Sequence, residues 1–235
     1  MKIFEKILSV VLPHKCTFCR KAIEYTNNTF ICKSCADTLP FIKGRKCIKC
    51  GIPIDDNAMP VCSVCRRYKH SFTQGFIPLV YKDSVRKSLL SLKFYKRKSA
   101  CRAFSYLILN RIIEEGFPTF DFVTYIPVSK ERLKERGFNQ AELIAKMCAE
   151  HLNLPVIPTL YRVDDTPRQS KLSMRLRRQN AKKSFMPLDV KLNGSALLID
   201  DVYTTGSTLS HTSNLLLKLG CSKVYIAAVA ISSKN

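Results

Sequence analysis

Residues 196–209, with the sequence ALLIDDVYTTGSTL, join a buried strand to the start of a helix and decide the fold of the chain. The apolar run from Ala196 to Ile199 does not alternate with polar residues, which is typical of a strand covered on both faces of a parallel sheet. The leucines at 209, 216 and 219, followed by Gly220, predict a helix that ends at the glycine. Alternating strand and helix signals from Ser71 onward predict an α/β domain.

Polar residues fill the connection between this strand and this helix. Asp200 and Asp201 follow the strand at its carboxyl end, where open α/β sheets bind their ligands. Hydroxyls, backbone amides and one glycine come next, in Thr204, Thr205, Gly206, Ser207 and Thr208. A helix that starts in this way can hold phosphate. Because two carboxylates would repel a triphosphate, the pattern favours a ligand that offers ribose hydroxyls to the acids and one phosphate to the turn.

The string from Leu198 to Thr208 resembles the PRPP-binding motif of type I phosphoribosyltransferases, where PRPP is 5-phosphoribosyl 1-pyrophosphate. The resemblance implies that Asp200 and Asp201 bind the ribose 2′ and 3′ hydroxyls, that residues 204–208 bind the 5′-phosphate, and that Mg²⁺ accompanies PRPP. A strand end of the Walker B kind and an ordinary turn remain the alternatives. The eight glycines of the chain form neither GxGxxG nor GxxxxGK[ST], so the usual dinucleotide and P-loop motifs lack their anchor.

The composition fits one good core and a small second module. The chain has 235 residues, of which 46% are hydrophobic. Its formal charge of +21 makes nucleic acid the first partner to consider, because such an excess raises the association rate with polyanions. General solubility and attraction to acidic lipid are the alternatives.

Eight of the eleven cysteines form four CxxC pairs, separated by gaps of 12, 11 and 11 residues. The pairs are Cys16 with Cys19, Cys32 with Cys35, Cys47 with Cys50, and Cys62 with Cys65. Thiolates in CxxC pairs suit tetrahedral zinc, so four pairs predict two structural Cys₄ sites. The spacing leaves open whether successive or alternate pairs combine. One zinc with spare thiols is a further alternative.

The N-terminus makes a poor signal peptide, because its apolar run from Ile7 to Leu12 is short and follows Glu5 and Lys6. No stretch approaches the length of a membrane span. We therefore expect a reduced, cytoplasmic protein whose paired cysteines bind metal. Residues 1–70 are predicted to form a double zinc ribbon, and residues 71–235 a phosphoribosyltransferase-like domain with a parallel sheet flanked by helices.

Within the second domain, we predict strands at 76–81, 121–128 and 156–161, with a final strand at 223–231 that closes the sheet. Helices are predicted at 83–93 and 99–115. A third helix, running to Leu152, begins with a capping box formed by Asn139 and Glu142.

Basic residues cluster in three segments of this domain. In type I phosphoribosyltransferases the connection that corresponds to the one after the predicted strand at 121–128 binds pyrophosphate. The resemblance therefore assigns that role to Ser129, Lys130 and Arg132. Residues 162–183 match by position the flexible loop that closes over PRPP. Candidate lid or DNA contacts are Lys93, Arg136, Arg168, Lys171, Arg175 and Arg178. Phe94 or Tyr95 could stack on bases or belong to the core, and solvated charged turns are the alternative for the basic residues.

The order of these motifs, including RGFNQ at 136–140, is similar to the ComF family of competence proteins over nearly the whole chain. The resemblance implies a role in natural transformation, with single-stranded DNA and a helicase-like partner on the cytoplasmic side. It leaves catalysis open. Three hypotheses follow: a PRPP-binding, DNA-associated competence protein; an active phosphoribosyltransferase with an unknown nucleobase acceptor; and a zinc-ribbon adaptor with a vestigial enzyme domain. The sequence contains neither HExxH nor GxSxG.

Overall fold

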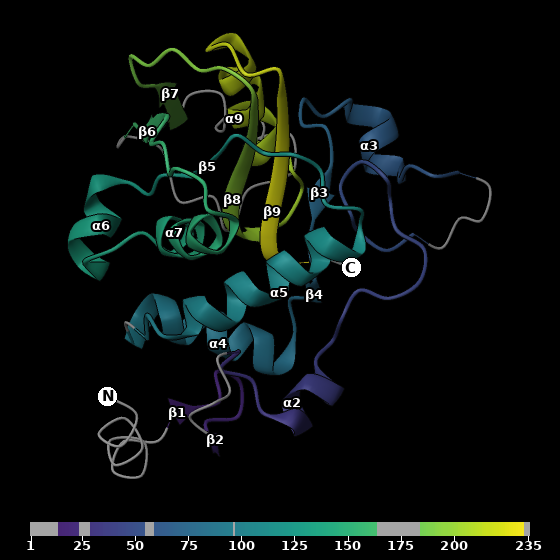
Figure 1. Ribbon diagram of the computed structural model, residues 1–235, viewed down its shortest axis with the longest axis vertical. Coiled ribbons are helices and arrows are strands. Elements are labelled where there is room, and N and C mark those ends of the chain that lie inside the picture. Colours follow the sequence, from purple (N-terminus) through teal and green to yellow (C-terminus); the bar gives the residue numbers. More distant parts are fainter. Residues whose placement is uncertain (1–13, 24–28, 55–58, 96, 164–183, 233–235) are drawn as a thin grey trace.

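The computed structural model describes residues 14–23, 29–54, 59–95, 97–163 and 184–232. Its centre is a five-stranded sheet in the order β3-β9-β8-β5, with β4 also paired to β9 (Figure 1). The strands are β3 Gly75–Phe76, β4 Leu79–Val80, β5 Phe122–Tyr125, β8 Ser195–Tyr203 and β9 Lys223–Ile231. Every pair in this sheet is parallel, so the carboxyl ends of the strands share one edge.

The central strands β8 and β9 separate two apolar cores. Leu197 and Ile199 belong to the core on one face of the sheet, whereas Ala196 and Leu198 belong to the core on the other. This division follows from the alternation of side chains along a strand. The unbroken apolar run at 196–199 is therefore explained by a strand that has no solvent-facing side.

Helices cover both faces. On one side lie α4 Asp83–Tyr95, α5 Ala100–Glu114 and α7 Gln140–Leu152, and on the other lies α9 Ser207–Lys218. These confirm the predicted helices and, with the sheet, the predicted α/β class. The short helix α6 Lys130–Arg136 was not predicted, because it buries no residue and so carries no apolar period. Within the described ranges, no helix has the length and apolar character that crossing a membrane requires.

Three local predictions need correction. The strand predicted at 76–81 is split into β3 and β4 around Pro78, whose nitrogen cannot donate to the ladder. The segment predicted as a strand at 156–161 forms one bridge, between Val156 and Val123, before β6 Leu160–Arg162 pairs antiparallel with β7 Phe185–Pro187. Strand β9 does not close the sheet but lies inside it, between β3 and β8.

The predicted capping box is half correct. Asn139 caps α7 by accepting a hydrogen bond from the amide of Ala141 at 3.0 Å. Glu142 pairs instead with Lys146 one turn later, at 2.6 Å. The helix therefore starts where the sequence predicted, with one of the two expected contacts.

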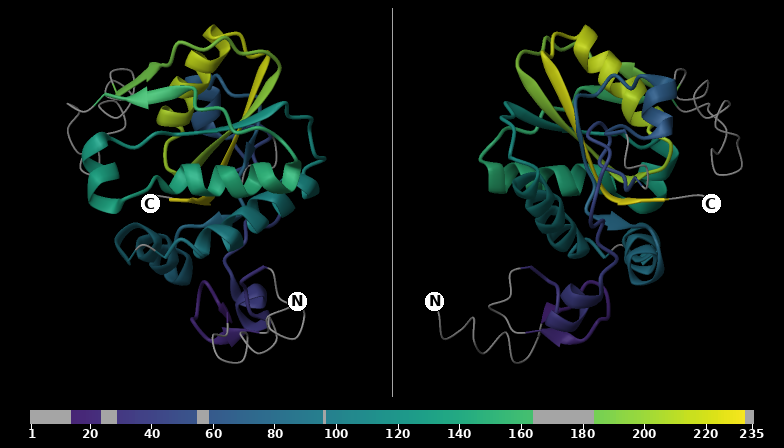
Figure 2. Two further views of the ribbon diagram at one scale, coloured as in Figure 1. Left: turned by 60° about the vertical axis from the view of Figure 1, so that its left-hand side comes forward. Right: turned by 90° about the vertical axis from the view of Figure 1, so that its right-hand side faces the viewer.

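The cysteine-rich segments pack on opposite sides of the sheet. The first contains β1 His14–Lys15, β2 Ala22–Ile23 and α2 Lys33–Thr38, and its Phe18 and Phe30 join the core that contains α4 and α5. The second contains α3 Ser63–Tyr68, and its Cys50 joins the core that contains α9. Figure 2 shows the first segment at one end of the molecule, beyond α4. A domain boundary near residue 70 stays a prediction.

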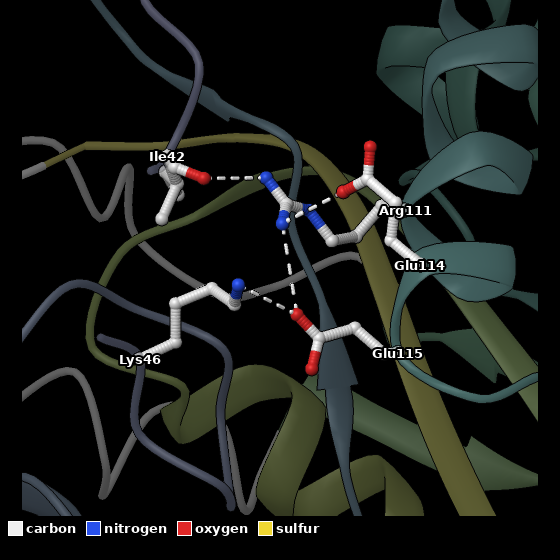
Figure 3. Close-up of polar contacts among 5 residues, drawn as sticks. All are labelled: Ile42, Lys46, Arg111, Glu114 and Glu115. Atoms are coloured by element: carbon white, nitrogen blue, oxygen red, sulfur yellow. Dashed lines mark hydrogen bonds and ion pairs between the residues drawn. The ribbon is translucent and has the colours of Figure 1, made fainter. Parts of the chain in front are cut away.

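Arg111 of α5 forms a hydrogen bond to the chain between the two cysteine segments (Figure 3). The Arg111 side chain is 6% exposed and donates from Nη2 to the carbonyl of Ile42 at 2.6 Å. Its Nη1 lies 3.0 Å from Glu114 and 3.6 Å from Glu115. Lys46 reaches the same Glu115 oxygen at 3.0 Å. Polar contacts thus fix the path by which the chain crosses from one face to the other.

Candidate functional site

The eight paired cysteines gather into two clusters of four, formed by successive pairs. One contains Cys16, Cys19, Cys32 and Cys35, and the other contains Cys47, Cys50, Cys62 and Cys65. In each cluster the four sulfur atoms lie within 4.8 Å of one another. The Cys50 and Cys62 sulfurs are 3.8 Å apart, close to the roughly 3.8 Å edge of a tetrahedron with Zn–S bonds of about 2.3 Å. The geometry therefore selects successive pairing over the alternate arrangement.

Backbone amides point at several of these sulfurs. The amide of Cys32 donates to the sulfur of Cys16 at 3.4 Å, and that of Cys62 donates to Cys47 at 3.3 Å. Such bonds stabilise thiolates, the form in which cysteine binds metal. Four cysteine ligands complete a tetrahedral shell, so both sites are structural in type. The remaining cysteines, at 101, 148 and 221, are buried apart from the clusters, as expected of small core residues.

A cavity of about 470 Å³ opens at the carboxyl edge of the sheet. Its walls come from the end of β8 and the turn after it, from the segments that follow β5, and from the last turn of α4. The lining includes seven residues predicted from the sequence: Lys93, Arg132, Arg136, Asp200, Asp201, Thr204 and Thr208. Segments that lie far apart in the sequence thus meet where parallel sheets of this kind bind ligands.

The acidic pair, Asp200 and Asp201, forms part of the lining of this cavity. Burial and, next, the charge of Asp201 raise the pKa of Asp200 to about 7. Asp201 forms an ion pair with Lys93 of α4. Burial by itself lowers the pKa of Lys93, but Asp201 and Asp200 outweigh this effect and raise it above its ordinary value. Lys93 is therefore a charged partner of the pair.

The turn after β8 has the form of an anion site. Gly206 adopts a left-handed conformation with φ of 70° and directly precedes α9, whose first residue is Ser207. The hydroxyls of Thr205 and Ser207 lie 2.8 Å apart, and the amide of Ser207 donates to Thr205 at 3.4 Å. Exposed amides and the positive end of the α9 dipole favour a bound anion here.

Two arginines, Arg132 and Arg136, also line the cavity. Arg136 donates to Gln140 at 3.1 Å, and its guanidinium lies 6.0 Å from the centroid of the Phe94 ring. Burial and the nearby Arg132 both lower the pKa of Arg136. The two positive charges repel each other, and a bound anion would relieve this repulsion. Phe94 is 62% exposed, so it is not a core residue.

Other predicted residues lie elsewhere. Ser129 caps α6 by accepting from the amide of Arg132 at 3.4 Å, and Lys130 is exposed beyond the cavity lining. Thr205, Gly206 and Ser207 form the turn between the lining residues Thr204 and Thr208 and are not themselves part of the lining. Arg168, Lys171, Arg175 and Arg178 lie outside the described residues.

The sequence did not single out several residues that complete the lining. Among them are Tyr81, Arg162 and Phe185, which come from three different elements or their ends. Arg162 and Phe185 are directly paired between the antiparallel strands β6 and β7, with the guanidinium 5.3 Å from the ring centroid. No local motif marks them, because only the tertiary fold brings them to the cavity.

Comparison with known proteins agrees with the cysteine geometry. Residues 7–68 match a family model described as a double zinc ribbon domain. The fold and these sites therefore define an α/β protein that carries two zinc-ribbon sites of the Cys₄ type.

The curated relatives are similar over most of their length. Competence protein ComFC of Bacillus subtilis is 31% identical, with 81% of this chain and 79% of the relative covered. DNA utilization protein YhgH of Salmonella typhi is 29% identical over 92% of this chain and 96% of the relative. Competence protein F of Haemophilus influenzae is 28% identical over the same shares. The chain belongs to the ComF family of competence proteins.

Solved structures give a weaker match. Adenine phosphoribosyltransferase from Thermoanaerobacter pseudethanolicus is 16% identical over 62% of this chain and 73% of that chain, with a TM-score of 0.37. The enzyme from Leishmania tarentolae is 12% identical over 72% and 88%, with a TM-score of 0.36. At these scores the similarity carries no conclusion about the ligand.

Proposed function

We propose that this protein binds PRPP in the cavity at the carboxyl edge of the sheet and acts with single-stranded DNA during DNA uptake. The observation that carries the ligand half is the placement of the acidic pair, the phosphate-type turn and two arginines around one cavity. The DNA half is supported by the competence and DNA utilization proteins to which the chain is similar, and by its formal charge of +21.

Each part of PRPP has a chemically matched partner in this proposal. Asp200 and Asp201 accept hydrogen bonds from the two ribose hydroxyls through their carboxyl oxygens. The start of α9 receives the 5′-phosphate through backbone amides and hydroxyls. Arg132, with the segment that begins at Ser129 and Lys130, receives the pyrophosphate, which carries Mg²⁺ as its counter-ion.

Single-stranded DNA is proposed to bind next to the cavity mouth. The exposed ring of Phe94 can stack on a base while Arg136, which lies over that ring, contacts the backbone. The basic residues Arg168, Lys171, Arg175 and Arg178 are proposed as further contacts or as a lid. A helicase-like protein of the same uptake pathway, on the cytoplasmic side, is the proposed protein partner.

Calorimetric titration with Mg²⁺-PRPP tests the ligand half. We expect saturable binding to the wild type and loss of binding in the Asp200→Asn, Asp201→Asn double variant. Asp37→Asn is the matched control, because it removes an exposed acid from α2, far from the cavity lining. Equal binding by the wild type and the double variant would contradict the proposed role of the acids.

Fluorescence anisotropy with a labelled single-stranded oligonucleotide tests the DNA half. Binding through phosphate contacts releases counter-ions, so affinity should fall steeply as the salt concentration rises. Phe94→Ala should weaken binding by about 1 to 3 kcal/mol if the ring stacks on a base. Affinity that is independent of salt would contradict binding through the basic surface.

Phosphoribosyl transfer is the second candidate. It is favoured because one cavity contains the residues proposed to bind the ribose, the 5′-phosphate and the pyrophosphate of PRPP. It requires release of pyrophosphate when Mg²⁺-PRPP meets a nucleobase or a related acceptor. A screen of acceptors with a pyrophosphate assay tests it, with the Asp200→Asn, Asp201→Asn variant as the blank. PRPP binding without turnover on any acceptor would favour a binding protein or an adaptor over an enzyme.

A further inference from the structure

Lys93 forms an ion pair with one member of the acidic pair in the cavity. It lies in the last turn of α4, between the core residue Leu92 and the exposed Phe94, and reaches across to Asp201. The side chains of Lys93 and Asp201 are 21% and 17% exposed, so their ion pair is largely shielded from water. The packing of Leu92 in the core fixes the direction in which Lys93 leaves the helix.

The acidic pair needs a positive partner. Asp200 and Asp201 are adjacent in the sequence, and both line the same cavity. Two carboxylates that share a partly dehydrated site repel each other, and the repulsion is relieved by a cation or by a proton. Adjacent carboxylates facing a cavity are also the oxygen ligands that hard divalent cations prefer. The ion pair with Lys93 supplies the positive charge from within the chain.

We propose that Lys93 is the resident counter-cation of the acidic pair, so that Asp200 and Asp201 hold no divalent ion and are reserved for a neutral diol. The identity of the diol as a ribose rests on the proposed function. A phosphorylated sugar without pyrophosphate then binds in the absence of metal. Mg²⁺ is needed only by the pyrophosphate of PRPP.

The chemistry of lysine suits this role better than that of a metal ion. An ammonium group is a point charge on a flexible stem, and it neutralises a carboxylate while leaving other lone pairs of the oxygens free. Those lone pairs can accept hydrogen bonds from hydroxyls. Mg²⁺ demands octahedral geometry and would hold the same oxygens in its own shell.

Binding of Mn²⁺ to the protein without any sugar tests this directly, with free Mn²⁺ measured by electron paramagnetic resonance. Lys93→Met keeps much of the side-chain length and removes the charge, so this variant should bind one Mn²⁺ per chain that the wild type does not bind. Lys93→Arg keeps the charge and should resemble the wild type. Mn²⁺ binding at the acidic pair of the wild type, or no gain in Lys93→Met, would overturn the proposal.

Lys146→Met is the matched control, because it also removes a lysine from a carboxylate partner. Lys146 pairs with Glu142 on the surface of α7, and its side chain is 58% exposed. An isolated, hydrated carboxylate is a poor site for a divalent ion, so this variant should gain no Mn²⁺. A gain equal to that of Lys93→Met would mean that removing any lysine has this effect, and would overturn the assignment.

A second titration uses ribose 5-phosphate in buffer freed of divalent cations by a chelating resin. The wild type should bind, Lys93→Met should bind at least tenfold more weakly, and added Mg²⁺ should restore part of the loss. Equal binding by both proteins without metal would overturn the role of Lys93. If neither protein binds ribose 5-phosphate or PRPP with or without Mg²⁺, the proposed function fails, while the Mn²⁺ result still decides whether Lys93 keeps metal from the acids.

Discussion

The side chain of Tyr203 lies beneath Gly206 and leaves no room there for a Cβ atom. Tyr203 is 2% exposed. Burial raises the pKa of its hydroxyl, and the neighbouring thiols of Cys50 and Cys65 raise it further. Because Tyr203 contacts both the turn and the second cysteine site, that site supports the turn from below.

Gly206→Ala should destabilise the protein more than a positive φ alone explains. A left-handed φ of 70° costs a side chain roughly 1 kcal/mol, and overlap with Tyr203 adds to it. Gly137→Ala is the control, because its φ is 78° but no atom lies within 4 Å of the added Cβ. Urea unfolding measures both losses, and equal losses would contradict close packing under the turn.

Loss of a ligand from the second cysteine site should loosen the turn, whereas loss of one from the first should not. Cys50→Ser removes a sulfur close to Tyr203, and Cys19→Ser removes one from the cluster on the other face of the sheet. Hydrogen exchange of residues 203–210 reports the difference. Faster exchange in Cys50→Ser alone is expected, and the same change in both variants would show that the coupling is not local.

Stability should depend on pH through Asp200. Burial and the charge of Asp201 raise its pKa from 3.8 to about 7 in the folded protein, so folding is favoured when this group is protonated. Its contribution is fully present below the unfolded pKa and is lost as the pH rises through about 7.

Asp200→Asn removes this dependence, because the amide does not titrate. We expect the variant to be more stable than the wild type at about pH 8, by on the order of 4 kcal/mol, and the difference to shrink towards about pH 5. Urea unfolding at several pH values measures it. A difference that stays constant with pH would contradict the raised pKa.

Arg111→Met should destabilise the crossing between the two cysteine segments. It leaves the buried carbonyl of Ile42 without its 2.6 Å hydrogen bond, at a cost of about 1 to 3 kcal/mol. Lys46→Met removes only a partly exposed ion pair with Glu115 and should cost about 1 kcal/mol or less. Equal effects in thermal unfolding would contradict a special role for Arg111.

Much of the framework could be predicted from the sequence, because strong local signals carry it. The unbroken apolar run at 196–199 identified a strand covered on both faces, and CxxC spacing identified the metal-type sites. Spacing could not decide how the pairs combine, since both arrangements satisfy it. The position of β9 inside the sheet was missed because strand order depends on long-range pairing, which leaves no local pattern.

The cavity could be predicted only in part, because some of its residues share one local motif and others meet only through the tertiary fold. Asp200 lies near the end of β8 and Thr204 directly follows that strand, so one stretch of sequence reveals both. The ion pair between Lys93 and Asp201, in contrast, joins residues from α4 and β8. The sequence marked Lys93 as a candidate lid or DNA contact beside two aromatics, and gave no sign of its pairing with Asp201. Arg162, the first residue of the predicted lid segment, was not singled out as a contact and reaches the lining from β6, which pairs with β7.

The most direct measurement compares ribose 5-phosphate with 2-deoxyribose 5-phosphate by calorimetry on the wild-type protein. The two ligands carry the same phosphate and differ by one hydroxyl, which the acidic pair of Asp200 and Asp201 is proposed to bind. Loss of a hydrogen bond to a charged group should weaken the deoxy sugar by about 1.5 to 3 kcal/mol, or roughly 10- to 150-fold. Equal affinity for both sugars would contradict binding of the ribose diol by the acidic pair.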